Sequence, residues 1–379
     1  MRKNKLGTYI IGFDKIILLS YVLLALIGLI VMVDITSVQS SMTYFYRHLL
    51  FLLVSGLSAV LILYFFNFEK LRFANTWLVY IAITMLLLVL VMGTTVKGGT
   101  RQISLGFISF QPSFFARIAL VFLFANVLDK KNDLLLQATP KTFFSSFPEL
   151  IILTGIVFGL IIAERHLSTL IIGGMTLFGM LAYAGIKKRI LLLVLVIGLL
   201  GGIAILKFGA EFRMERIHTY KRYSLFFKER DLSQSGDGDY QVRESLTALT
   251  SGGLIGTGIA RGRAKHYYLP EARTDYIYTI IGEEAGFLGA IVVFGLHCLL
   301  FFRALKVCNA NDNRYLRFLG VGIAMNVFCN VLVNTGVAMS ILPPTGNTLP
   351  FISYGGTALL MDSASVGIIL NISAQRRQL

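Results

Sequence analysis

Charge is scarce in this sequence. Charged residues make up only 15% of the 379 residues, against about 25% in an ordinary soluble domain. Hydrophobic residues reach 55%, and Leu, Ile, Val and Phe run in blocks that repeatedly lack charge. Each block is long enough to cross the roughly 30 Å hydrocarbon layer of a bilayer as a helix. A single water-soluble core is therefore excluded.

Cysteine is scarce too. Cys298, Cys308 and Cys329 show no spacing typical of a metal site or a disulfide framework, so we expect them to serve in packing. Ligand-type residues form no cluster that requires a metal. The sequence leaves open a divalent cation, Mg²⁺ or Mn²⁺, and implies no other cofactor.

A cleavage site is also missing after the first apolar block. Its 18 residues, 16–33, exceed the usual length of a signal-peptide core, so we expect it to stay as an anchor. The net charge of +15 would indicate nucleic-acid binding in a soluble protein. Here, placing the N-terminus in the cytoplasm puts 18 Lys and Arg residues on inner segments and four in short outer loops. The positive-inside rule thus predicts that both termini are cytoplasmic, and no nucleic-acid partner is expected.

The apolar blocks predict an all-α fold, namely a polytopic integral membrane protein that forms a single domain over residues 1–379. The ten predicted transmembrane helices cover residues 16–33, 49–66, 77–96, 114–128, 150–163, 167–186, 190–206, 286–303, 318–342 and 357–373. The segment between the seventh and eighth helices, residues 207–285, holds 12 basic and 11 acidic residues with many aromatics. Long loops escape the charge rule, so we place this loop outside and interpret it as the working part.

The best candidate for chemistry is the run Tyr267–Phe287, within that loop. Glu271 and Asp275 stand four residues apart, so on a helix both carboxylates would share one face and act as base and orienter. The apolar residues that follow would raise the pKa of Asp275 toward a value useful for taking a proton. The alternative is that both carboxylates pair with Arg273 or Lys265 and only solvate a loop.

Two groups of cations are candidate phosphate ligands. Arg261, Arg263 and Lys265 alternate with glycine and small residues, a pattern that suits an anionic headgroup. Lys97 and Arg101 flank a glycine pair before a predicted helix. The alternatives are a solvated face for the first group and a juxtamembrane anchor for the second.

Ionisable residues at membrane depth are further candidates, because a buried charge there costs about 2.5 kcal/mol or more. Arg117 lies one turn into its helix and would either function or snorkel outward. Glu164, Arg165 and His166 connect two predicted helices, where Glu164 could simply neutralise Arg165. Asp362 lies near one end of the last helix.

The segment Val333–Leu360 is the strongest irregularity within reach of the membrane. Three prolines and several glycines break its helical pattern repeatedly. Broken backbone at that depth is tolerated only where it lines a cavity or is buried in protein. We therefore expect a cavity there.

Four strings, in order along the chain, carry a family resemblance. They are KGGTR and ISFQPS within Lys97–Ser113, YQVRESLTALTSGGLIGTGI at Tyr240–Ile259, YLPEARTDYIYTIIGEEAGFLG at Tyr268–Gly289 and LPPTGNTLPFISYGG at Leu342–Gly356. Over nearly its whole length the chain resembles the SEDS family (shape, elongation, division and sporulation), represented by FtsW and RodA. The opening DKIILLSYVLLALIGLIVMV and the run AKHYYLPEARTDYIY favour the FtsW branch.

The resemblance implies a peptidoglycan glycosyltransferase that polymerises lipid II outside the cytoplasmic (inner) membrane of a bacterium. Septal wall synthesis in cell division is favoured over elongation. The implied partners are lipid II and the glycan linked to undecaprenyl pyrophosphate, a class B penicillin-binding transpeptidase, and other membrane proteins of the divisome or elongasome. The family's usual partner surface corresponds to the predicted helices 286–303 and 318–342.

The resemblance also assigns one catalytic residue. The aspartate of the family motif PE-x-x-TD falls on Asp275, and its implied role is to activate the acceptor hydroxyl. Two departures weaken the expectation of full activity. Where the family has Glu and Lys in FQPSE-x-x-K, this chain has Phe114 and Arg117. Where the family has PDLGT, this chain reads Arg165 to Thr169, although the adjacent Glu164 offers a local carboxylate.

Three functions therefore remain to be distinguished. The first is glycosyl transfer, with Asp275 as base and with Arg101, Arg261 and Lys265 stabilising the leaving pyrophosphate. The second is a lipid II flippase, and the third is a noncatalytic scaffold, which the departures from the motifs would permit. If His166 faces the outer cavity with an ordinary pKa of about 6.5, it gains positive charge beside the substrate as pH falls. Lipid II binding should then strengthen between about pH 8 and 6. The alternative is a neutral, hydrogen-bonded His166.

Overall fold

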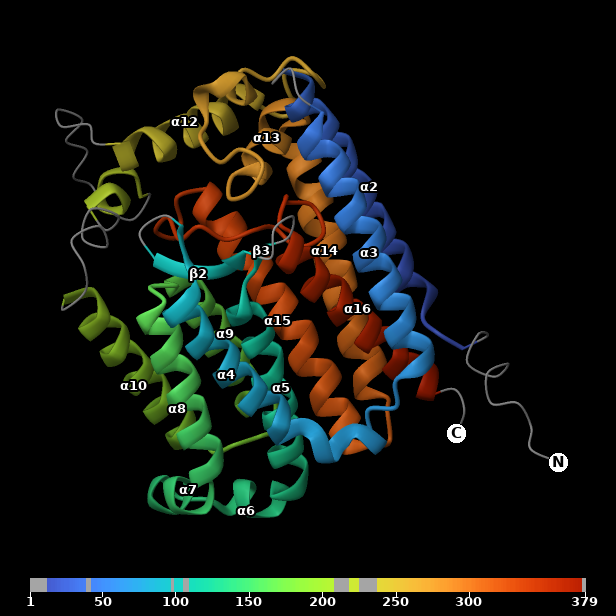
Figure 1. Cartoon of the computed structure of the whole chain (residues 1–379), viewed down its shortest axis with the longest axis vertical. Helices are drawn as coiled ribbons and strands as arrows, with labels where there is room; N and C mark the ends of the chain where they lie inside the picture. Colours follow the sequence, from blue (N-terminus) through green and yellow to red (C-terminus); the bar gives the residue numbers. More distant parts are fainter. Residues whose placement is uncertain are drawn as a thin grey trace.

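The computed structural model describes residues 12–38, 42–96, 99–104, 109–207, 218–224 and 237–376. Helices dominate the described part of the chain and pack side by side into one bundle (Figure 1). Lys97, a predicted phosphate ligand, lies outside the described residues.

Ten long helices coincide with the ten predicted spans, and their ends differ from the predicted ends by at most six residues. They are α2 (Lys15–Val38), α3 (Thr43–Phe65), α4 (Asn75–Met92), α5 (Pro112–Lys130), α8 (Pro148–Ala163), α9 (Leu167–Tyr183), α10 (Lys188–Lys207), α14 (Gly286–Asn309), α15 (Arg314–Ala338) and α16 (Gly356–Arg376). Eight described helices are long and apolar enough to cross a membrane alone. The bent pair of α7 (Pro140–Ser146) and α8 would add a ninth, and α9 is a shorter apolar helix. A polytopic membrane protein is therefore the architecture.

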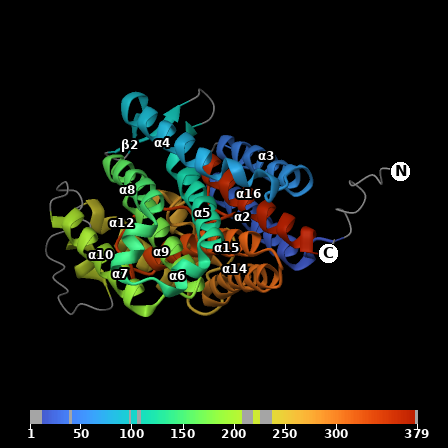
Figure 2. The ribbon, with the colours of Figure 1, turned by 90° about the horizontal axis from the view of Figure 1, so that it is seen from below.

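Helices α5, α15 and α16 form the interior of the bundle. Within their most apolar stretches 83%, 72% and 83% of residues are buried, against 6% in α10, which lies at the rim (Figure 2). Helix α15 packs against α5, α9, α14 and α16, while α16 packs along α3. The Asn371 amide of α16 donates to the carbonyls of Leu63 and Phe66, at 2.9 and 2.8 Å, where α3 ends. Interhelical hydrogen bonds of this kind satisfy helix-end carbonyls and help hold apolar helices together.

The two ends of the bundle differ in character. At one end the Asp14 amide donates to Ser373 Oγ at 3.0 Å, and Arg303 Nη2 lies 2.8 Å from Asp14 Oδ2. The start of α2 and the ends of α14 and α16 therefore meet there. Helices α12 (Asp237–Gly252) and α13 (Ile277–Glu284) cover the opposite end (Figure 1).

A backbone clasp joins two stretches at that covered end. The amides of Thr257 and Gly258 donate to the carbonyls of Glu283 and Glu284, at 2.9 and 3.1 Å. In the other direction, the Phe287 amide donates to Gly253 O at 2.9 Å. Residues 253–258 thus pair with residues 283–288, which places the glycine-rich run beside the end of α13.

The all-α prediction is confirmed, and beside the helices the chain forms a small antiparallel sheet in the order β1-β2-β3. Its strands are β1 (Thr94–Val96), β2 (Gly99–Ser104) and β3 (Ser109–Phe110), with Thr94 opposite Gln102 and Ile103 opposite Phe110. Thr, Val, Ile and Phe in this stretch favour strands, but the strands are too short and polar to stand out among long apolar blocks. Shorter helical pieces were also missed, namely η1 (Lys70–Ala74), α6 (Asn132–Gln137), α7, α12, the π-helical turn η2 (Ala264–Tyr268) and α13.

Candidate active site

Asp275 lies in a turn rather than on a helix. Residues 270–276 form consecutive turns, and α13 begins only at Ile277. The cause is Glu271, whose φ of 58° interrupts any helix, and whose carbonyl accepts hydrogen bonds from the amides of Thr274 and Asp275, both at 3.1 Å. The predicted helical face shared by Glu271 and Asp275 is therefore wrong. Glu271 is exposed, and its carboxylate accepts a 2.8 Å hydrogen bond from Thr274 Oγ1.

The backbone carbonyls of residues 273–275 each accept a hydrogen bond from the C-terminal part of the chain. The pairs are Tyr354 N to Arg273 O at 2.9 Å, Ser353 Oγ to Thr274 O at 2.6 Å and Asn334 Nδ2 to Asp275 O at 3.0 Å. Two donors come from the irregular segment 339–355, and the third comes from α15. Because three consecutive carbonyls of this turn have hydrogen-bond donors, the backbone at Asp275 is fixed, and so is the direction in which the Asp275 side chain leaves it.

The Asp275 carboxylate lies against the same irregular segment. A Cβ added to Gly346, which has a φ of 72°, would stand 3.4 Å from Asp275 Oδ2. The neighbouring Asn347 donates to Asn330 Oδ1, and its own carbonyl accepts from Asn334. The broken segment that was expected to line a cavity therefore reaches the candidate base directly, and the cavity itself stays a prediction.

The apolar stretch that follows Asp275 along the chain is buried. Asp275 is half-buried, and the residues that follow it are buried, namely Tyr276, Ile277, Tyr278, Ile280 and Ile281. On another side, the Arg273 guanidinium lies over the Tyr44 ring, 3.7 Å from its centroid. The carboxylate therefore sits where a packed interior meets the accessible end of the bundle, which is where a base must lie to meet a substrate.

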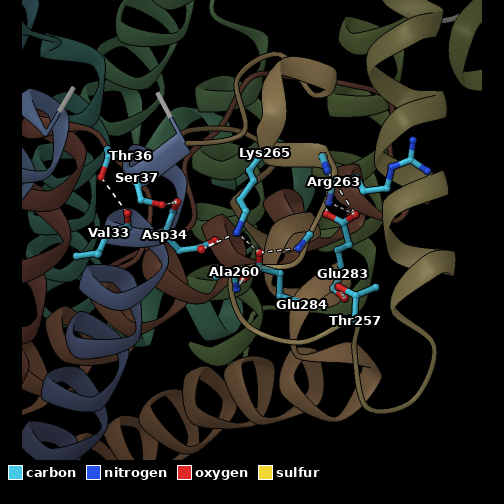
Figure 3. Close-up of polar contacts among 12 residues, drawn as sticks. Val33, Asp34, Thr36, Ser37, Thr257, Ala260, Arg263, Lys265, Glu283 and Glu284 are labelled. Atoms are coloured by element: carbon cyan, nitrogen blue, oxygen red, sulfur yellow. Dashed lines mark hydrogen bonds and ion pairs between the residues drawn. The ribbon is translucent and has the colours of Figure 1, made fainter. Parts of the chain in front are cut away.

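The predicted cation group divides into two kinds of residue. Arg261 and Arg263 are exposed, and Arg263 lies 5.9 Å from the centroid of the Tyr268 ring. Lys265 is only 2% exposed, and its ammonium is ion-paired with Asp34 and Glu284 (Figure 3). The two arginines keep the exposure that a phosphate contact requires, whereas Lys265 does not.

A second polar region lies where β2 meets the connection between α8 and α9. Arg101 Nη2 donates to Arg165 O at 2.8 Å, and the Arg165 side chain is exposed. Glu164 is fully buried, and neither carboxyl oxygen has a hydrogen-bond partner among the described residues. Burial raises the pKa of Glu164 to about 8, although the charge of Arg101 acts against that rise. Arg101 is thus an electrostatic partner of Glu164. The neutralisation of Arg165 by Glu164, which the sequence suggested, stays a prediction.

His166 is buried beside this region. Its Nδ1 lies 3.0 Å from Gln111 Nε2, 3.1 Å from Ser113 Oγ and 2.8 Å from Thr169 Oγ1. Burial, and then the charges of Arg101 and Arg117, hold the pKa of His166 well below 6.5. This direction disfavours the predicted gain of positive charge between pH 8 and 6. The alternative of a neutral histidine is favoured, with side chains as partners instead of a helix-end carbonyl.

Arg117 does not snorkel. It is 3% exposed, with its guanidinium 5.0 Å from the centroid of the Phe114 ring. Its Nε and Nη1 have no hydrogen-bond partner among the described residues, and it interacts electrostatically with the buried Asp362 of α16. The counter-charge missing at Phe114 is therefore supplied from another helix, which local sequence reading could not reveal.

The sequence reasoning missed Asn334, Ser353 and Tyr354. A signal for the first was present, because Asn326, Asn330 and Asn334 recur every fourth residue and so share one face of an apolar helix. All three are buried. Among the described residues, no group of three or more His, Cys, Asp or Glu side chains could hold a metal ion. A divalent cation therefore stays a prediction.

Comparison with known proteins agrees with the motifs. The model of the FtsW/RodA/SpoVE family, described as cell cycle proteins, matches residues 13–378. A probable peptidoglycan glycosyltransferase FtsW from Geobacter sp. (strain M18) is 32% identical, over 97% of this chain and 98% of the relative. Stage V sporulation protein E of Bacillus subtilis (strain 168) is 31% identical, over 96% and 98%.

Solved structures share the fold. One, concerning structural coordination of polymerization and crosslinking by a peptidoglycan synthase complex, contains a chain 25% identical with a TM-score of 0.78, covering 97% of this chain and 100% of that one. The rod shape determining protein RodA of Thermus thermophilus is 22% identical, with a TM-score of 0.69 over 98% and 99%. The second likeness shows the fold alone.

Proposed function

The chain belongs to the FtsW/RodA/SpoVE family of cell cycle proteins, and we propose that it is a peptidoglycan glycosyltransferase that polymerises lipid II in cell division. The observation that carries this proposal is the setting of Asp275. Its turn is anchored on three consecutive carbonyls, and its carboxylate lies against Gly346. A fixed and partly accessible carboxylate is what general-base chemistry requires.

In the proposed reaction, the 4-hydroxyl oxygen of the acceptor sugar attacks the anomeric carbon of the donor glycan, with inversion from α to β. The new C–O bond forms as the bond from that carbon to undecaprenyl pyrophosphate breaks, and the pyrophosphate leaves with the electron pair. Asp275 takes the hydroxyl proton. The exposed Arg261 and Arg263 are suited to stabilise the charge on the leaving group, as Arg forks do for phosphate oxygens. A divalent cation could share that task.

We further propose ten membrane spans with both termini in the cytoplasm of a bacterium. The support is that α2 begins, and α14 and α16 end, at the same end of the bundle, joined through Asp14. Residues 207–285 then lie outside the inner membrane, together with Asp275. This placement matches a lipid II headgroup that is polymerised on the outer face.

A class B penicillin-binding transpeptidase is the proposed partner, alongside other membrane proteins of the divisome. The similarity to a chain from a peptidoglycan synthase complex supports it. Helix α14 offers the larger open surface, because large apolar side chains along it are exposed, namely Phe287, Leu288, Ile291, Val292, Leu299 and Phe302. Helix α15, the other predicted partner helix, is mostly buried.

The test uses the purified full chain with its transpeptidase partner and labelled lipid II. We expect the wild type to make glycan strands and Asp275→Ala to make none. Asp312→Ala is the matched control, because Asp312 is exposed in the turn between α14 and α15 and should leave polymerisation unchanged. Equal polymer from Asp275→Ala and wild type would end the assignment.

The flippase alternative draws on one observation, the buried Arg117 and Asp362 within the bundle. Reconstituted vesicles that contain fluorescent lipid II and an external quencher would measure translocation. Protein-dependent flipping without polymerisation would replace the first proposal. A scaffold would instead be indicated by Asp275→Asn supporting growth in cells depleted of the native protein.

A further inference from the structure

We propose that Lys265, Asp34 and Glu284 form an ion-paired latch that positions Asp275. This inference rests on the proposed function, since it concerns how the same catalytic aspartate is presented. The three residues come from three separate elements, namely the π-helical turn η2, the end of α2 and the end of α13. They are positioning residues, because none of them has to touch the substrate.

The contacts of the latch are short and buried (Figure 3). Lys265 Nζ donates to Asp34 Oδ1 and to Glu284 Oε1, both at 2.6 Å. All three side chains are less than a tenth exposed. Burial alone would lower the pKa of Lys265, but the hydrogen bonds to the two carboxylates outweigh it and raise that pKa. The ammonium therefore stays charged and holds both partners.

Backbone contacts extend the latch across the glycine-rich run. Glu284 Oε1 accepts from Gly262 N at 3.1 Å, and the adjacent Glu283 Oε1 accepts from Arg263 N at 2.8 Å. Both glutamates close α13, the helix that follows Asp275. The carboxylates thus tie residues 260–265, which precede the catalytic turn, to the helix that follows it.

Position along the chain shows what the latch encloses. Asp275 lies ten residues after Lys265 and nine before Glu284, so the ion pair closes a loop with Asp275 near its middle. Asp34 then fastens that closed loop to a membrane helix 231 residues upstream. Closing a loop removes conformational freedom from the residues within it. Removing one partner from a buried ion pair leaves an uncompensated charge, so the arrangement is sensitive to single changes.

The main experiment compares Lys265→Met with Lys221→Met in the full chain with its transpeptidase partner. Lys221 is an exposed lysine of the same large loop, so its change removes the same charge without breaking the latch. We expect kcat per folded molecule to fall about 100-fold for Lys265→Met, the loss that a displacement of about 1 Å can cause. The KM for lipid II should change little. Lys221→Met should match the wild type.

Two further variants separate positioning from folding. Lys265→Arg keeps the charge and should recover part of the kcat. Asp34→Asn keeps the size of the side chain and should also lower kcat, and it replaces Lys265→Met in the assay if that variant is too unstable. Wild-type kcat per folded molecule in Lys265→Met, or in Asp34→Asn, would overturn the latch. If Asp275→Ala is inactive in the same assay, that result leaves the proposed function standing. Failure of the wild type to polymerise would instead remove both proposals.

Discussion

Two buried polar clusters on this chain differ in how many of their charged groups have hydrogen-bond partners. In the cluster around Lys265, the ammonium donates to two carboxylates, and Glu284 also accepts the backbone amide of Gly262, although Asp34 Oδ2 has no partner among the described residues. In the region around Glu164, both carboxyl oxygens and two nitrogens of Arg117 have no hydrogen-bond partner among the residues described. An unsatisfied buried polar group costs about 1–3 kcal/mol. The first cluster therefore leaves one oxygen unsatisfied and holds three elements together, whereas the second carries the larger free-energy cost.

The difference follows the departures from the family motifs. The segment that carries Asp275 keeps its motif, and its polar contacts are complete enough to fix a turn. The second region has Phe114 and His166 where the motifs have acidic residues, and Asp362 of α16 interacts electrostatically with Arg117 there. Substitutions in the first region should thus damage activity, whereas substitutions in the second should chiefly change stability and its pH dependence.

The largest expected effect is that of Asp275→Asn. Turnover per folded molecule should fall by about 10²–10⁴, the usual contribution of a general base. Lipid II binding should persist, because the amide keeps the shape of the side chain. Polymerisation kinetics and a direct binding assay measure the two quantities. A fall in binding with unchanged turnover would place Asp275 in substrate recognition instead.

Glu164→Gln should change how stability depends on pH. The pKa of Glu164 is raised to about 8 in the fold from 4.5, so the folded state holds a proton that the unfolded state releases. The contribution of Glu164 to stability should therefore be full below pH 4.5 and fall by about 1 kcal/mol per pH unit as pH rises toward 8. Gln cannot ionise, so the variant should lose less stability over that range. Thermal unfolding in detergent from pH 5 to 8 tests this, with the exposed Glu149→Gln as control.

Asn334→Ala should lower stability by about 1–3 kcal/mol, because it leaves the carbonyls of Asp275 and Asn347 without their donor. Asn326→Ala is a matched control on the same face of α15. Asn326 is equally buried, and Oδ1 has no partner in either residue among those described, but only Asn334 donates to the carbonyls of Asp275 and Asn347. Thermal unfolding of both variants would show the contrast, and equal losses would mean that packing alone matters on this face.

The smallest effect belongs to His166→Gln. Burial and the charges of Arg101 and Arg117 lower the pKa of His166 well below 6.5, which favours its neutral form. Lipid II binding should therefore show the same pH profile in wild type and variant. A pH dependence lost on substitution would show that His166 titrates near the substrate after all.

Sequence alone was enough for the ten long helices, because long apolar blocks are local signals, but it missed the shorter helical pieces. The end of α9 at Tyr183 was placed within three residues, and Gly185, with a φ of 77°, follows it. Pairings distant in sequence were beyond reach. Lys265 reads as a free cation until Asp34 is brought beside it, and Arg117 reads as unpaired until α16 supplies Asp362. Asp275 could be found because its motif and its apolar flank are contiguous.

The clasp between residues 253–258 and 283–288 has a consequence for mutational tolerance. A Cβ at Gly256 would stand 2.0 Å from Glu284 O, and one at Gly286 would stand 2.3 Å from Gly256 N. Each obstacle is backbone, so no change of a neighbouring side chain relieves it. In a saturation screen for cell growth, these glycines should tolerate replacement as poorly as Asp275 does. Such a screen would not distinguish variants that fail to fold from variants that fold but cannot catalyse the reaction. Activity measured per folded molecule would separate the two.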